Sequence, residues 1–227
     1  MPRLTDIGLE SDLDWNSAAR FRLQTRHIAA LVERYLTPIQ HERIWKVLVK
    51  CCSIPVHDHP KVIGGVLDVL IHLDARNFYT LTPIEKKAFA LKAISDGITA
   101  AAVGGEIDPA PFEQALVKAT EAGLINRWRS PKKPKSAPDR KHIAVLECVH
   151  EAESFVATLV VTDRRGIEVL RCQAIETRPL ERTFVPKLKS LAWTDNATVS
   201  LDGKMFSIGG AGKGQRKGSG DDGLLPK

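Results

Sequence analysis

The sequence has few of the residues that mark secreted, membrane or disulfide-stabilised proteins. Its four cysteines, Cys51, Cys52, Cys148 and Cys172, are too few and too irregularly spaced for a disulfide framework. The amino terminus, MPRLTDIGLESDLDW, has acidic residues where a secretory signal needs a basic region and an apolar run. No later stretch approaches the roughly 18 apolar residues that span a bilayer. We therefore expect a cytoplasmic protein with reduced thiols that does not enter a membrane.

Catalytic and cofactor-binding motifs are also absent. His150-Glu151 is not followed by a histidine four residues on, as the helix of a zinc metalloprotease requires. Gly64-Gly65 and Gly104-Gly105 lack the glycine spacing and the following Lys-Ser or Lys-Thr of a phosphate-binding loop. We therefore expect no catalytic residue and no cofactor, and we predict that the protein is not an enzyme.

One stretch raises the question of a metal. Residues 51–60 read CCSIPVHDHP, in which Cys51 and Cys52 precede His57, Asp58 and His59. Zinc takes four tetrahedral ligands, usually in pairs two to four residues apart, whereas the side chains of adjacent cysteines point apart. The favoured interpretation is that the cysteines are small hydrophobic residues at the end of a buried helix and that the other three are polar loop residues. We expect no metal here.

The net charge of +6 lies in one segment. Residues 127–141, RWRSPKKPKSAPDRK, hold seven basic residues and one acidic residue, so the rest of the chain is neutral. Its three prolines favour a solvated loop or linker, because proline lacks the backbone donor of helices and strands. The functional alternative is a basic arm for an acidic protein surface or for phosphates, with Trp128 stacking on a base. The candidate partner-binding residues are Arg127, Trp128, Arg129, Lys132, Lys133, Lys135, Arg140 and Lys141.

The first 60 residues predict a hairpin of two helices. Asn16-Ser17 can cap a helix whose apolar residues, from Phe21 to Tyr35, recur at intervals of three and four. Thr37-Pro38 ends this helix and starts another over residues 38–50, PIQHERIWKVLVK.

The middle of the chain predicts a strand and two helices. Residues 67–73 alternate between apolar and other side chains, as a strand does. Thr82-Pro83-Ile84-Glu85 is a capping box for a helix that runs to Gly97. Asp108-Pro109 starts a second helix, which ends near Gly123.

Beyond the basic segment the hydrophobic period changes to two. HIAVLECVH, SFVATLVVTD and GIEVLRCQAI, all between residues 142 and 175, predict an antiparallel meander. Its middle segment is apolar on both faces, which indicates a central strand covered by helices. Residues 197–208 predict a hairpin with Asp202-Gly203 as its turn, and the glycine-rich tail 209–227 is expected to be disordered.

These elements predict an α+β fold. We expect an amino-terminal helical hairpin (1–60) and a core domain (61–208) that contains the basic loop 127–141. The core is expected to be a mainly antiparallel sheet of about five strands, covered by the helices that start at Thr82 and Asp108.

The element order resembles that of bacterial immunity proteins, which neutralise polymorphic or contact-dependent toxins. The resemblance covers residues 60–205, from the strand and capped helix VLDVLIHLDARNFYTLTPIEKKAFALKAI to LAWTDNATVSLDG. It implies a stoichiometric inhibitor that covers a cognate toxin, and it transfers no functional residue. The basic balance departs from the acidic character of nuclease inhibitors, so the expected partner presents an acidic surface. The alternatives are a nucleic-acid-binding protein that uses residues 127–141 and an undetected hydrolase.

Overall fold

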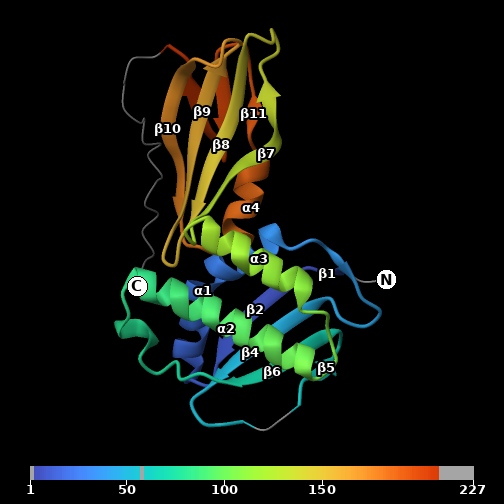
Figure 1. The fold of residues 1–227 in the computed structure, drawn as a ribbon. Coiled ribbons are helices and arrows are strands. Elements are labelled where there is room, and N and C mark those ends of the chain that lie inside the picture. The colour runs from blue at the N-terminus through green and yellow to red at the C-terminus, as the bar shows by residue number, and fades with distance from the viewer. Residues whose placement is uncertain (1–2, 57–58, 210–227) are drawn as a thin grey trace, which may run out of the picture.

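Two hydrophobic cores, one in each half of the chain, organise the computed structural model, which describes residues 3–56 and 59–209. We call residues 3–124 the amino lobe and residues 126–209 the carboxy lobe; they lie one above the other in Figure 1. In chain order the elements are β1 (Arg3–Leu4), β2 (Asp6–Ser11), α1 (Trp15–Tyr35), β3 (Ile39–Gln40), β4 (Lys46–Cys52), β5 (Lys61–Ile63), β6 (Val66–His72), a 3-10 turn (Phe78–Thr80), α2 (Pro83–Val103), α3 (Ala110–Glu121), β7 (Asn126–Ser136), β8 (His142–His150), β9 (Phe155–Asp163), β10 (Glu168–Thr177), α4 (Glu181–Lys189), β11 (Ala192–Trp193), β12 (Thr198–Leu201) and β13 (Lys204–Ser207).

The amino lobe is built on a four-stranded sheet of order β2-β4-β6-β5, in which β2, β4 and β6 are parallel and β5 is antiparallel. Alternate residues of each strand are buried against the helices, as Val47, Val49 and Cys51 are in β4. In Figure 1, α2 and α3 lie in front of this sheet. The α+β class is confirmed.

The expected helical hairpin is wrong. The first helix exists, as α1, although Asp14 rather than Asn16-Ser17 is its cap. The second expected helix, residues 38–50, instead contributes the short strand β3 and most of β4. Residues 46–51 alternate between Lys or Leu and buried Val or Cys, and this period of two decides the structure. Cys51 and Cys52 accordingly end a strand and not a helix. The expected boundary near residue 60 lies within the first core, which includes residues on both sides of it.

Helix α1 also protects the free edge of β2. The Ile7 backbone N–H donates to the Glu33 carboxylate at 2.8 Å, and the Ile7 carbonyl accepts from the Arg26 guanidinium at 3.2 Å. An edge strand exposes unpaired backbone groups to other chains. Side chains of α1 satisfy two of these groups in place of a neighbouring strand.

The capping box at the start of α2 is confirmed, with reciprocal hydrogen bonds between Thr82 and Glu85. The expected end of this helix at Gly97 is wrong, because α2 continues to Val103. Gly97 is buried, and a Cβ at this position would lie 2.3 Å from Val49 Cγ2. The glycine therefore permits close packing of α2 on β4 and does not end the helix.

In the carboxy lobe, the meander and the final hairpin are confirmed. Strands β7 to β10 form an antiparallel sheet, and β8 has the expected bounds, His142–His150. Strands β12 and β13 meet at Asp202-Gly203, both with positive φ. The single sheet of about five strands is wrong, because the strands of residues 3–56 and 59–209 form four separate sheets.

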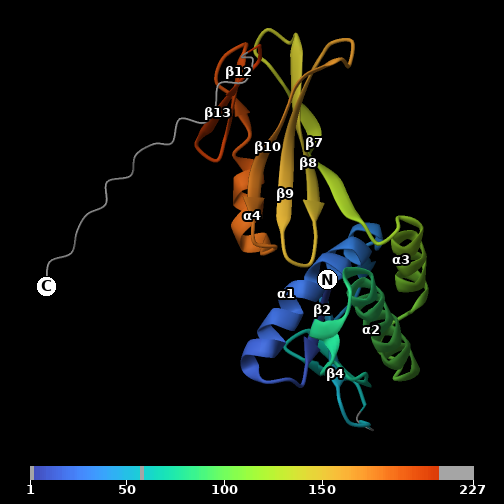
Figure 2. The ribbon, with the colours of Figure 1, turned by 90° about the vertical axis from the view of Figure 1, so that its left-hand side faces the viewer.

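The covering of the antiparallel sheet also differs from expectation. Helices α2 and α3 pack in the amino lobe. One face of the sheet β7–β10, here called the inner face, is instead covered by α4 and the three-stranded sheet β11-β12-β13, as Figure 2 shows.

On the opposite, outer face a chain of ion pairs crosses the sheet: Arg129 to Glu147 at 2.8 Å, Glu147 to Arg171 at 2.9 Å, and Arg171 to Glu168 at 2.8 Å. Val160, on this face, is only 4% exposed. Long charged side chains cover the apolar centre of the sheet where a helix was expected.

The basic segment is mostly a strand and not a loop. Residues 126–136 form β7, the edge strand next to β8. Ser130 pairs with Leu146 and Lys135 with Ala144, so residues 131–134 bulge out opposite Val145. Prolines, lysines and bulges are tolerated at sheet edges and prevent pairing with other chains. The prolines that indicated a loop therefore fit an edge strand.

None of the helices in the described part of the chain is both long and apolar enough to cross a bilayer. The tail that was expected to be disordered lies, from residue 210 onward, outside the described residues.

We predict that Gly97→Ala destabilises the protein. An alanine in place of a helical glycine normally gains about 1 kcal/mol. Here the new Cβ meets Val49, and overpacking of this kind costs roughly 1–3 kcal/mol. Chemical denaturation measures the difference. The same change in a Val49→Ala background, where the Cβ has room, is expected to be neutral or stabilising; a stabilising Gly97→Ala in the wild-type background would contradict this packing.

Candidate functional site

The eight residues predicted to bind a partner do not form one surface. Arg127, Trp128 and Arg129 lie at the start of β7, beside the amino lobe, whereas Lys132 to Lys141 lie toward the far end of the carboxy lobe. The two groups have different surroundings and are described separately.

Trp128 is a packing residue. Its ring lies 5.7 Å from that of Phe155 and 6.3 Å from that of Phe184, and the Arg34 guanidinium lies 4.2 Å above it. The ring is half-buried, and the Arg34 guanidinium occupies one of its faces, which leaves less room for the predicted stacking on a nucleic-acid base. Arg129 is exposed but is held by Glu147, and Arg127 is exposed.

The far end of the carboxy lobe gathers basic side chains from two separate segments. The Arg164 guanidinium, in the turn between β9 and β10, donates to the Arg140 carbonyl at 2.9 Å and to the Asp139 carbonyl at 3.5 Å. Arg165 is exposed beside it. We call the resulting surface the basic tip; its residues are Lys132, Lys133, Lys135, Arg140, Lys141, Arg164 and Arg165.

Two further contacts fix the tip in place. The Trp193 indole N–H donates to the Lys135 carbonyl at 2.8 Å, and the Asp139 backbone N–H donates to the Asn196 side chain at 3.0 Å. Both partners belong to the small sheet of β11 to β13 or its first turn. The basic side chains therefore extend from a braced backbone.

The aspartates of the tip act mainly within turns. Asp163 accepts from the backbone N–H of Arg165 at 2.8 Å and of Ile167 at 2.9 Å, and Asp195 accepts from Ala197 at 2.7 Å. Asp139 accepts from the Lys141 backbone at 2.9 Å. The two side-chain hydrogen bonds of Arg164, by contrast, go to carbonyl oxygens and not to carboxylates. Lys141 also forms an ion pair with Asp139 at 3.9 Å. The basic charge of the other tip residues remains available to a partner.

Sequence reasoning missed Arg164 and Arg165 because they are far from the basic segment along the chain. The signal that could have found them is the meander itself. In an antiparallel arrangement of β7 to β10, the β7–β8 connection and the β9–β10 turn must lie at the same end of the sheet.

The cysteines do not form a reactive centre. Burial raises the pKa of Cys51 to about 12 and that of Cys148 to about 12, and it also raises the pKa of Cys52 and of Cys172. The nucleophilic form of a cysteine is the thiolate, which is scarce at neutral pH when the pKa is raised.

The possible metal site in residues 51–60 lies only partly within the described structure. His59 is exposed, whereas His57 and Asp58 lie outside the described residues. Within residues 3–56 and 59–209, no group of three or more His, Cys, Asp or Glu side chains is arranged to hold a metal ion.

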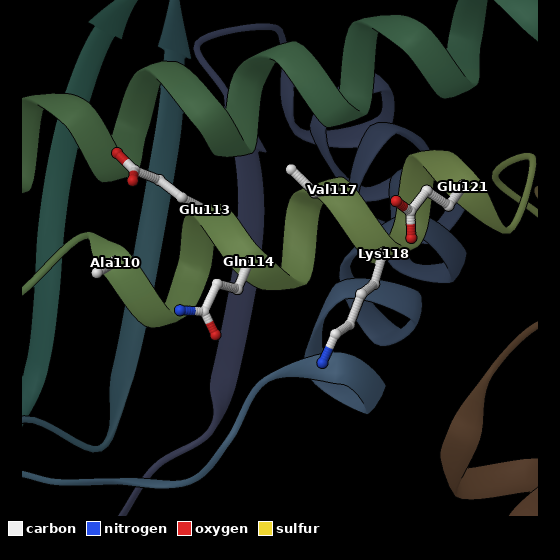
Figure 3. Close-up of a pocket in the computed structure, with 6 residues that line it drawn as sticks. All are labelled: Ala110, Glu113, Gln114, Val117, Lys118 and Glu121. Carbon is white, nitrogen blue, oxygen red and sulfur yellow. The ribbon is translucent and has the colours of Figure 1, made fainter.

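Two hollows elsewhere do not present a site. One lies on the outward face of α3, where Glu113 and Val117 point to one side of the helix and Gln114 and Lys118 to the other, as Figure 3 shows. These side chains diverge, so they do not converge on a ligand.

The other is a groove of about 350 Å³ beside β2. It is lined by charged residues that pair with one another: Lys46 with Asp6 at 3.7 Å, Arg22 with Glu10 at 3.0 Å and Arg26 with Glu181 at 2.9 Å. These pairs neutralise the charges that a ligand would otherwise meet.

We expect the four thiols to react in order of their exposure. At mildly alkaline pH, iodoacetamide is expected to modify the partly exposed Cys172 first, and Cys51 and Cys148 only after unfolding, because burial both covers the sulfur and suppresses the thiolate. Peptide mass spectrometry of time points provides the order. Rapid modification of Cys51 in the folded protein would show an activated thiol and contradict its packing role.

Comparison with known proteins found no match to a family model, to a curated protein or to a solved structure.

Proposed function

We propose that the protein is a non-enzymatic binding protein that docks an acidic surface of a protein partner through its basic tip. One observation carries this proposal: Arg164 hydrogen-bonds the Arg140 carbonyl and so adds the basic β9–β10 turn to the basic end of β7. Clustered charges of one sign steer the encounter with a partner of opposite sign.

A binding role also fits the chemistry of the rest of the described chain. Catalysis by a nucleophile or by acid and base needs a titratable side chain tuned toward the working pH. The thiols are shifted away from neutrality, and the charges of the groove beside β2 are paired. These features support a protein that acts by contact.

A protein partner is favoured over a nucleic acid. Trp128 is half-buried with Arg34 over its ring, and Trp193, the aromatic residue at the tip, donates to the Lys135 carbonyl and has the His142 ring stacked 6.5 Å away. Single strands are bound by stacking on accessible aromatic rings together with basic charge. Aspartates also stand among the cations of the tip, which suits the mixed charges of a protein surface better than a row of phosphates.

The more specific form of the proposal is an immunity protein, a cytoplasmic inhibitor that neutralises a cognate bacterial toxin by direct binding. The tip stands at the end of a sheet, away from the amino lobe, in both Figure 1 and Figure 2. A preformed surface of this kind binds with little rearrangement.

Charge reversal at the tip is the test. We expect Lys132→Glu/Lys133→Glu/Arg165→Glu to slow association with the product of the neighbouring reading frame at least about tenfold at low salt, because steering is lost. The melting temperature is expected to change little, since these side chains are exposed. The readouts are association kinetics and protection of cells that express that product.

The matched control is Arg3→Glu/Arg20→Glu/Lys118→Glu, which changes the charge equally but in the amino lobe. Equal association rates for the two triple variants would contradict docking by the tip. Retardation of duplex DNA by the wild type, with an affinity that falls steeply with salt, would contradict a protein partner.

A further inference from the structure

The two lobes are joined covalently at one place. The chain passes from α3 to β7 through Gly123 and Leu124, which both have positive φ, 66° and 55°. Everything else that holds the lobes together is non-covalent, and interfaces of this kind allow relative motion unless they are large and apolar.

The junction between the lobes is polar. The side-chain contacts that cross it include Gln24 to Glu153 at 3.0 Å, Lys87 to Glu151 at 2.8 Å, Arg26 to Glu181 at 2.9 Å and Arg34 to Asn126 at 2.9 Å. Each hydrophobic core lies on its own side of the junction. The interface therefore depends on hydrogen bonds and charges.

At the centre of this junction lie two histidines, one from each lobe. His27 of α1 is 0% exposed and His150 at the end of β8 is 1% exposed, and their ring centroids are 6.3 Å apart. The Asn126 side chain donates to the His27 backbone carbonyl at 2.8 Å, and the His150 ring packs on Phe184 of α4 at 5.3 Å. Both rings are thus part of the interface.

Their hydrogen bonds fix the tautomers. His27 Nδ1 lies 2.8 Å from the Gln24 carbonyl and His150 Nε2 lies 3.2 Å from the Pro179 carbonyl. A carbonyl oxygen only accepts, so each of these nitrogens carries the proton of a neutral ring. The opposite nitrogen of His27, Nε2, is buried without a hydrogen-bond partner among the described residues. A second proton on His27 would create a charged donor in this site.

We propose that this histidine pair is an acid-sensitive junction: protonation of either ring separates the two lobes while each lobe keeps its fold. The proposal is independent of the partner proposed above.

The surroundings oppose protonation. Burial, and then the charge of Lys87 on α2, lowers the pKa of His27 to about 4. Burial, and then His27, lowers the pKa of His150 to about 4, with Arg26 and Arg34 of α1 acting in the same direction.

The nearby carboxylates are already engaged. Arg26 holds Glu33 of α1 and Glu181 of α4, Lys87 holds Glu151, and Gln24 donates to Glu153 in the β8–β9 turn. A doubly protonated ring in the closed junction therefore meets positive charge from α1 and α2, and the carboxylates that face it have other partners.

The direction of these pKa shifts sets how the stability of the closed junction depends on pH. The pKa of each histidine is lower in the closed junction than the 6.5 of an exposed histidine. The contribution of the neutral rings is thus complete above pH 6.5 and is lost as the pH falls toward 4. Separation exposes both rings to water and lets them take up protons.

The experiment is small-angle X-ray scattering between neutral pH and about pH 4, with circular dichroism in parallel. For the wild type we expect the radius of gyration to rise while secondary structure is kept, and to stay well below the roughly threefold rise of unfolding. The double variant His27→Asn/His150→Gln places an amide N–H at Nδ1 and at Nε2 and cannot titrate. It is expected to stay closed at the acid end.

His72→Gln removes an exposed histidine of β6 and is expected to behave as the wild type does. Three results would overturn the proposal: a wild-type radius that does not change, loss of secondary structure together with expansion, or opening of the double variant at the same pH as the wild type. The last result would assign the pH dependence to the carboxylates of the junction. If the double variant is unfolded at neutral pH, the single variant His150→Gln replaces it. This variant is expected to open at a lower pH than the wild type. An opening at the same pH as the wild type counts against the proposal.

Discussion

The ion pair between Arg26 and Glu33 joins three parts of the molecule. The Arg26 guanidinium meets the Glu33 carboxylate at 2.6 Å, and both side chains bond the backbone of Ile7 in the edge strand β2. Arg26 also reaches Glu181 of α4 at 2.9 Å. Breaking a largely buried pair usually costs about 3–5 kcal/mol, because a charge remains without its partner. One pair of side chains therefore closes the parallel sheet and connects it to the other lobe.

The two sheets protect their edges in different ways. Strand β2 is covered by α1, whereas β7 has prolines, lysines and a bulge. The lysines of β7 thus have a structural reason to be basic that needs no partner. Arg164 and Arg165 lie in a turn, where edge protection does not operate. Edge protection does not explain their position: Arg164 hydrogen-bonds the Arg140 carbonyl, and the proposed docking role would account for the basic charge that both arginines add to the tip.

The sequence predicted local structure well where one signal dominated. The meander of residues 142–175 has a clear period of two and β-branched side chains, and the Thr82 capping box has its own hydrogen bonds. It failed where two signals conflicted. Residues 38–50 have apolar residues at helical spacing as well as an alternating end, and pairing with β2 and β6 stabilises the strand that the alternation favours.

The candidate site was predictable only in part for a related reason. Lys132 and Lys133 stand out by composition. The contact of Arg34 with the Trp128 ring, however, depends on the packing of the two lobes. The hydrogen bond from Arg164 to the Arg140 carbonyl depends on the length of two hairpins. The buried histidines give no sequence signal at all, because His27 and His150 become neighbours only when the lobes meet. Long-range packing decided each of these features.

The basic tip and the histidine junction lie at opposite ends of the carboxy lobe, so a change at one does not directly alter the contacts of the other. The tip is braced by Trp193 and Asn196 within its own lobe, so lobe separation leaves its geometry unchanged. A partner that contacts the tip alone is therefore indifferent to the junction. One that contacts both lobes gains affinity from the closed arrangement, and by linkage its binding must favour the neutral state of His27 and His150.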